Sequence, residues 1–171
     1  MGTDDSEGVP PIDRILDLAV AYNGRDVKRV NHLLKVHSFA RLLGIGEKCG
    51  PGMLTVVEAA ALLHDIGIHE AERKHGSSAG KWQELEGPPV ARELLEGLDL
   101  DPAARERILF LVGHHHSYGS VDGLDFQILV EADFLVNIHE EGMDVRSIES
   151  LGEGMFKTAS GRELLERLYL R

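Results

Sequence analysis

The run Ala59-Ala60-Ala61-Leu62-Leu63-His64-Asp65-Ile66-Gly67 decides the fold of this 171-residue chain. It completes a segment, residues 54 to 66, that is apolar nearly all round, a pattern typical of a helix through the middle of a domain. His64 and Asp65 are adjacent polar residues at the end of this run. An unpaired carboxylate in a dry core is strongly destabilising, so both side chains need partners. A structural hydrogen bond is the ordinary explanation for an isolated His-Asp pair, and a metal role requires further ligands.

The rest of the chain also has helical patterns, and no stretch alternates between apolar and polar residues as a strand would. Pro88-Pro89 and Asp101-Pro102 are typical helix starts. We expect helices over residues 11–23, 25–44, 54–66, 88–95, 101–113 and 128–136, weaker ones over 145–151 and 162–169, and a long loop with some helix over 68–86. The sequence therefore predicts an all-α, single-domain fold over residues 11–171, preceded by a disordered leader over residues 1–10.

Composition excludes several classes of protein. A formal net charge of -11 and a pI near 5.2 disfavour a nucleic-acid polymer as partner. The apolar stretches are too short to span a bilayer, and the start of the chain has no signal-peptide pattern. The single cysteine, Cys49, cannot form an internal disulfide. We expect a cytoplasmic protein that acts on a small molecule, and the leucines between residues 164 and 170 are compatible with a homo-oligomer.

Further residues of metal-ligand type interrupt the later helices. Asp133 lies in the apolar run from Leu129 to Val136, and the cluster His114-His115-His116 ends the helix that begins at Pro102. In several helices the apolar pattern ends at such a residue or is interrupted by one. Packing alone does not easily explain this recurrence. Imidazole and carboxylate ligands together suit manganese, iron, nickel or zinc. The pattern favours a metal site over a structural pair.

With these residues in place, the sequence resembles the HD-domain phosphohydrolases, whose signature is a histidine on one helix, a His-Asp pair on a later helix and a distant aspartate. His64-Asp65 and Asp133 match the pair and the aspartate, and the resemblance spans about residues 29 to 140. For the first histidine, His32 and His37 are alternatives about 140 degrees apart on the helical wheel. The family register, with Arg29, Val36 and Ala40 around the histidine, favours His32.

Members of this superfamily with two metals add histidines, and the resemblance implies the same here. His114-His115, eighteen residues before Asp133, resembles the bacterial diadenosine tetraphosphate hydrolase subgroup. Glu86 stands where that subgroup has another histidine, so it is either a ligand of a second metal or an ordinary solvated residue. The resemblance therefore implies an HD-type helical bundle with one or two divalent transition metal ions held by the following residues: His32, His64, Asp65, Glu86, His114, His115 and Asp133.

The resemblance also implies an activity, hydrolysis of a phosphate ester or anhydride of a nucleotide or small phosphorylated metabolite. His64 and Asp65 would then be catalytic, with Asp65 as the natural bridge between two metals. Arg73 and Lys74, on the charged segment after the pair, are candidates for binding a substrate phosphate. Two alternatives use the same ligands: a mixed-valent di-iron oxygenase, and a non-catalytic sensor of a nucleotide or a metal.

Overall fold

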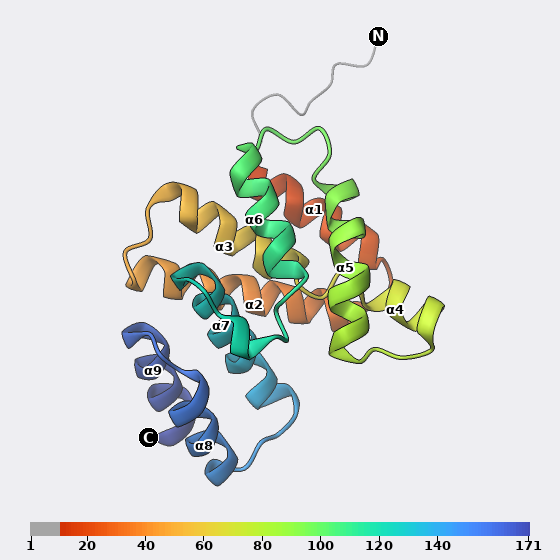
Figure 1. Ribbon diagram of the computed structural model, residues 1–171. Coiled ribbons are helices and arrows are strands. Elements are labelled where there is room, and N and C mark those ends of the chain that lie inside the picture. Colours follow the sequence, from red (N-terminus) through yellow and green to blue (C-terminus); the bar gives the residue numbers. More distant parts are fainter. Residues whose placement is uncertain (1–10) are drawn as a thin grey trace.

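Helices form the regular structure of residues 11–171, the part of the chain that the computed structural model describes, and no strand occurs among these residues (Figure 1). The elements are α1 (Pro11–Asn23), α2 (Val27–Gly46), α3 (Pro51–Leu63), α4 (Ile68–His75), α5 (Gly80–Leu94), α6 (Pro102–Val112), η1 (Tyr118–Ser120), α7 (Leu124–Glu140), α8 (Val145–Met155), α9 (Ala159–Leu165) and η2 (Glu166–Leu170). The prediction of an all-α, single-domain fold is confirmed. The leader expected over residues 1–10 lies outside the described residues.

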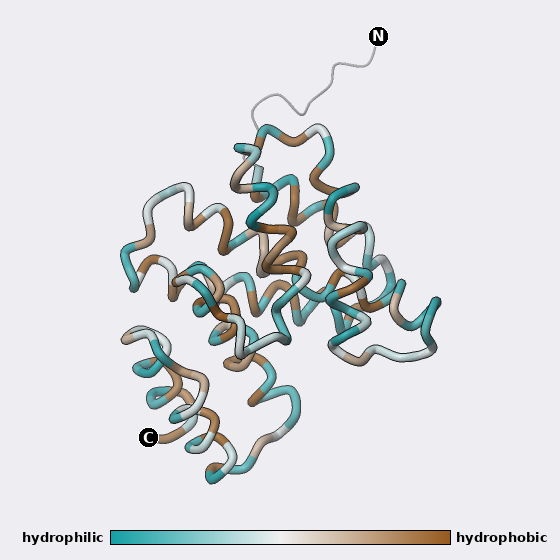
Figure 2. Tube along the Cα trace, viewed as in Figure 1, coloured by the Kyte–Doolittle hydropathy of each residue, from teal (hydrophilic) through white to brown (hydrophobic). Residues whose placement is uncertain are grey.

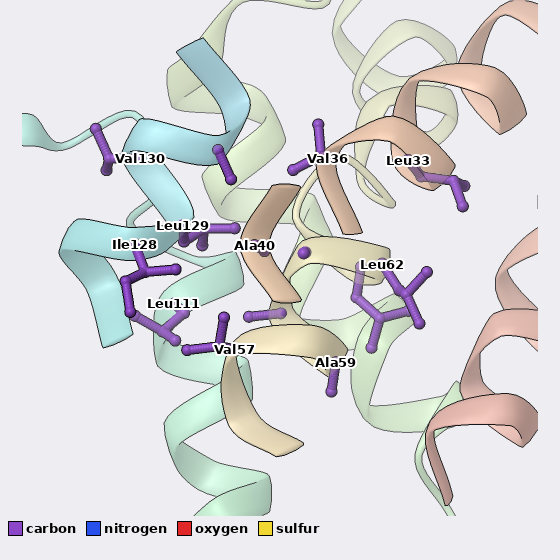
Figure 3. Close-up of a cluster of buried hydrophobic side chains, with 14 of the residues drawn as sticks. Leu33, Val36, Ala40, Val57, Ala59, Leu62, Leu111, Ile128, Leu129 and Val130 are labelled. Atoms are coloured by element: carbon purple, nitrogen blue, oxygen red, sulfur yellow. The ribbon is translucent and has the colours of Figure 1, made fainter. Parts of the chain in front are cut away.

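Helix α3 lies at the centre of the fold. Every residue from Val56 to Leu63 is buried, and α2, α6 and α7 pack around the helix. Figure 3 shows the side chains of these four helices meeting in one cluster, which includes Ala40, Leu62 and Leu129. In Figure 2 the hydrophobic positions gather where these helices meet. The apolar run that ends at His64 is therefore the core helix that the sequence predicts.

Contrary to the expectation that every apolar stretch is too short, one described segment could cross a membrane by length and composition alone. Pro51–His75 is long and apolar enough, but 67% of its most apolar window is buried inside the fold. It is also not one continuous helix, because a turn over residues 64–67 separates α3 from α4. This burial is typical of the core helix of a globular protein.

Residues 68–86 contain more helix than the long loop with some helix that the sequence suggested, and the expectation that Pro88-Pro89 opens a helix was wrong. Helix α4 begins at Ile68, and α5 begins at Gly80, so Pro88 and Pro89 lie inside α5 and do not open it. The helical pattern was hidden because the buried face of α5 carries polar residues, Gln83 and Glu86. Their bonds to other parts of the chain replace the apolar contacts that a sequence pattern can reveal.

The C-terminal helices α8 and α9 lie beside α7 (Figure 1). The fully buried carboxylate of Glu131, on α7, accepts hydrogen bonds from the backbone N–H groups of Lys157 and Thr158 and from the Thr158 hydroxyl. Tyr169 donates its hydroxyl hydrogen to the Leu135 carbonyl at 2.6 Å. These bonds attach the end of the chain to the helix that also carries Asp133.

Candidate metal centre

Four side chains from separate parts of the chain meet between α2, α3 and α7. His32 comes from α2, His64 and Asp65 follow α3 directly, and Asp133 comes from α7. The Nε2 atom of His32 lies 3.2 Å from Asp133 Oδ1 and 3.3 Å from His64 Nε2. The Oδ2 atom of Asp65 lies 3.5 Å from Nε2 of His32 and of His64. We call these four residues the first group.

A second group shares Asp65 with the first. Asp65, His115 and His116 offer ligand atoms that all lie within 4.8 Å of one another. The Oδ1 atom of Asp65 lies 3.4 Å from His115 Nε2, whereas Oδ2 faces the two histidines of the first group. The two oxygens of one carboxylate therefore face two different sets of nitrogen ligands.

Hydrogen bonds orient the imidazole rings. Nδ1–H of His64 donates to the Ala61 carbonyl at 2.8 Å, and Nδ1–H of His115 donates to the Val112 carbonyl at 2.9 Å. Because each carbonyl can only accept, Nδ1 carries a proton in both rings, and Nε2 is the nitrogen that faces the carboxylates and is available to a metal ion in the neutral ring. The buried Nε2 of His115 has no hydrogen-bond partner in the described chain. A buried nitrogen lone pair without a donor is suited to a metal ion, so the residues present fit the group that the family implies.

The remaining first-group histidine is held by a carboxylate. Nδ1 of His32 lies 2.9 Å from Oε2 of Glu140, near the end of α7, and Lys35 binds the other oxygen of Glu140. A carboxylate that accepts from Nδ1–H orients the ring and makes Nε2 a stronger ligand. Sequence analysis did not identify Glu140, although a glutamate seven residues, or two turns, after Asp133 on the same helix is a signal that could have found it.

The charges of the first group stabilise one another. Burial opposes the charged form of His64, but the carboxylates of Asp65 and Asp133 outweigh it and raise the pKa to about 9. Burial likewise opposes ionisation of Asp65 and Asp133, yet the surrounding histidines hold the pKa of both carboxyls far below the usual range. Without a metal, the first group is therefore an ion-paired cluster at neutral pH, and a metal ion must displace the proton of His64.

Two predicted ligands lie outside both groups. His114 donates Nδ1–H to the Phe110 carbonyl, and its ring stacks on Phe110 with centroids 4.1 Å apart. Glu86 accepts from Lys74 and lies 2.9 Å from Nε2 of His75. The structure therefore does not bring His114 or Glu86 to Asp65. The third residue of the second group is instead His116, which the sequence analysis did not include among the ligands.

The proposed phosphate-binding residues and the alternative first histidine are also elsewhere. Arg73 forms a two-pronged ion pair with Glu70 and is largely exposed. Lys74 lines a separate cavity together with Glu86. His37 lies 3.0 Å from the buried carboxylate of Glu58, so that His32 is the histidine of α2 that faces Asp65.

Two further side chains support the second group. Gln83 donates its amide N–H to the Ser78 carbonyl, which leaves its oxygen facing Nε2 of His116 at 3.2 Å. Burial and the neighbouring His115 lower the pKa of His116 to about 4, so its ring is neutral. Burial, with the Asp133 and Asp65 carboxylates, raises the pKa of Tyr118 to about 12, so its phenol keeps its proton. A neutral imidazole is the form that binds a metal.

Comparisons with known proteins agree with this geometry. A comparison with curated proteins found no match. The crystal structure of a predicted HD superfamily hydrolase from an uncultured Thermotogales bacterium has the same fold, with a TM-score of 0.65 and 24% identity over 96% of this chain and 88% of that chain. The model of the HD domain family matches residues 29–150. The residues of both ligand groups lie within the range that this model matches. The chain belongs to the HD domain family.

Proposed function

We propose that this protein is a metal-dependent phosphohydrolase that cleaves a phosphate ester or anhydride of a nucleotide or small phosphorylated metabolite. The position of Asp65 carries the proposal, because its Oδ2 faces His32 and His64 while its Oδ1 faces His115. A carboxylate placed in this way would allow one residue to serve both ions of a two-metal site. Two-metal sites are typical of enzymes that displace groups at phosphorus.

The proposal assigns the residues to two ions. His32, His64, Asp65 and Asp133 would hold the first ion, and Asp65, His115 and His116 would hold the second. Bound divalent metals supply Lewis acidity to a phosphoryl oxygen and lower the pKa of a water molecule. The mixture of imidazoles and carboxylates favours iron, manganese, nickel or zinc over magnesium or calcium.

The chain's own residues position these ligands. Glu140 orients His32, the Ala61 and Val112 carbonyls orient His64 and His115, and Gln83 orients His116. Asp65 is ionised across the working pH range, so it can bind both ions without losing a proton first. This preorganisation reduces the reorganisation that charge development at phosphorus would otherwise require.

The first experiment is elemental analysis of protein purified without chelator, together with a phosphate-release assay. We expect one to two equivalents of transition metal per chain in the wild type, and loss of metal and activity in Asp65→Ala and His32→Ala. His37→Ala is the matched control on the same helix, since His37 contacts Glu58 and not Asp65. Circular dichroism checks that each variant is folded.

A second pair of variants tests the second group. His115→Ala should lose one metal equivalent, whereas His114→Ala, one residue earlier, should keep the full complement because His114 stacks on Phe110. Wild-type protein that takes up no transition metal would contradict the proposal. Bound iron with oxygen-dependent turnover and no phosphate release would indicate a di-iron oxygenase, and tight metal binding without turnover in any metal would indicate a sensor.

A further inference from the structure

One cavity opens onto the first group. It has a volume of about 200 Å³, and His32 and Asp65 line its wall. Pockets that hold drug-sized ligands usually measure about 300–1,000 Å³. The space beside the first group is therefore too small to enclose a dinucleotide, but it is large enough for a phosphate group with a few further atoms.

The other residues that line this cavity are polar. Some of their side chains are paired with other described residues, and some are not. Arg29 forms ion pairs with Asp26 and Glu72, and Glu140 binds His32 and Lys35. The other three lining residues, Lys28, Asn137 and Glu141, form no side-chain hydrogen bond or ion pair in the described part of the chain. The cavity thus presents one free cation, one free amide and one free carboxylate to whatever enters it.

These free side chains have a fixed relation to the metal ligands. Lys28 lies one helical turn before His32 on α2, and Asn137 lies one turn after Asp133 on α7. Residues four apart on a helix share a face, so both free groups are on the faces that carry ligands. Glu141 follows α7 directly, next to Glu140.

We propose that the substrate is a small phosphomonoester whose non-phosphate part is short and carries hydroxyl or amino groups. Lys28 contacts the phosphate, and Asn137 and Glu141 contact the polar groups of the remainder. Water adds to phosphorus, the ester P–O bond breaks, the leaving oxygen takes up a proton as an alcohol, and inorganic phosphate is released. The volume of the cavity and the carboxylates of Glu140 and Glu141 in its lining disfavour a dinucleoside polyphosphate. The assignment rests on the proposed hydrolase function.

The substrate assignment is tested by comparing kcat/KM of the metal-loaded wild type for three probes: glycerol 3-phosphate, adenosine 5′-monophosphate and diadenosine tetraphosphate. The proposal expects glycerol 3-phosphate to be cleaved with the highest kcat/KM and the tetraphosphate with the lowest. A higher kcat/KM for diadenosine tetraphosphate would overturn it. If no phosphate ester is cleaved in any metal, the hydrolase function itself fails, and the binding experiments that follow still test the role of Lys28.

The role of Lys28 is tested by calorimetric titration of inorganic phosphate into metal-loaded protein, which requires no turnover. Lys28→Ala should weaken phosphate binding by about tenfold, the order expected for loss of one charge-assisted hydrogen bond. Arg25→Ala is the matched control, because Arg25 is an exposed cation three residues away that does not line the cavity. Equal affinity in Lys28→Ala and the wild type, or no phosphate binding by the wild type, would overturn the assignment.

Glu141 has a different expected signature. Glu141→Gln should raise KM for glycerol 3-phosphate while leaving the affinity for inorganic phosphate unchanged or slightly higher, because the removed charge contacts the alcohol part and repels the phosphate. Glu149→Gln, an exposed glutamate on α8, is the control. A lower phosphate affinity in Glu141→Gln with an unchanged KM would contradict the proposed orientation of the substrate.

Discussion

The substitution Gly67→Ala should weaken metal binding by the second group, although Gly67 is not itself a ligand. Gly67 ends the turn that carries His64 and Asp65, and α5 packs directly against it. A Cβ atom at this position would lie 2.5 Å from the Gly87 nitrogen and 2.6 Å from the Gln83 carbonyl oxygen. Both are backbone atoms, which cannot rotate away, so α5 must move. Overpacking of this kind costs about 1–3 kcal/mol, and we expect the upper end of that range.

The displaced residue Gln83 also holds His116, so the shift of α5 should weaken the second group. We expect a drop in Tm of roughly 6–12 °C, from about 2–4 °C per kcal/mol for a domain of this size, together with loss of one metal equivalent. Thermal denaturation of metal-free protein gives the first quantity and elemental analysis the second. Gly52→Ala is the control, because a Cβ there meets nothing within 4 Å. A Gly67→Ala protein with wild-type Tm and metal content would refute this reasoning.

Three other predictions follow from the described contacts. The pKa of His64 in the folded protein is raised to about 9 from 6.5, so its charge stabilises metal-free protein below pH 6.5, and this stability is lost as the pH rises through 9. The Tm of metal-free protein, measured from pH 6 to 10, should therefore fall over that window. A flat profile would contradict the ion-paired cluster. Glu140→Gln should weaken metal binding by about 10–100-fold, which is the usual effect of removing a carboxylate that orients a ligand histidine. Competition with a chelator measures the metal affinity, and Glu149→Gln, the control, should leave it unchanged. Glu131→Ala leaves the buried N–H groups of Lys157 and Thr158 without acceptors. It should therefore lower the free energy of unfolding, measured by urea denaturation, by about 3 kcal/mol. A decrease below 1 kcal/mol would show that water replaces the carboxylate.

The central part of the fold could be predicted because its signal is local and strong. The apolar run before His64 specifies a helix buried on all sides, and such a helix must lie in the core. The register around His32 indicated which histidine of α2 faces inward, and the structure places His32, and not His37, beside Asp65. For the core helix the periodicity of a single helix contains the information, whereas the choice of His32 over His37 came from the register of the family that the sequence resembles.

The parts that could not be predicted depend on contacts between helices. The first half of α5, residues 80–87, was missed because its inward face carries Gln83 and Glu86. The partners of these two side chains are Ser78, His116, Lys74 and His75, which lie outside α5. The choice among His114, His115 and His116 depends on where α6 ends. The helix stops at Val112 and a turn follows, so helical spacing no longer tells which ring points inward. The cavity could not be predicted from sequence periodicity either, because two of its lining residues, Lys28 and Glu141, are far apart in the sequence.

The candidate ligands are buried, whereas Lys28 and Glu141 at the cavity are exposed, so substitutions at the two kinds of position have different effects on folding. His32, His64, His115 and Asp133 are each at most 8% exposed and are embedded among core helices, so a change at any of them disturbs folding as well as chemistry. Lys28 and Glu141 lie on the surface, where substitutions usually alter stability by less than about 0.5 kcal/mol. Under the proposed substrate assignment, Lys28 and Glu141 can therefore be exchanged one at a time to change the substrate, while the buried residues of the candidate metal centre stay the same.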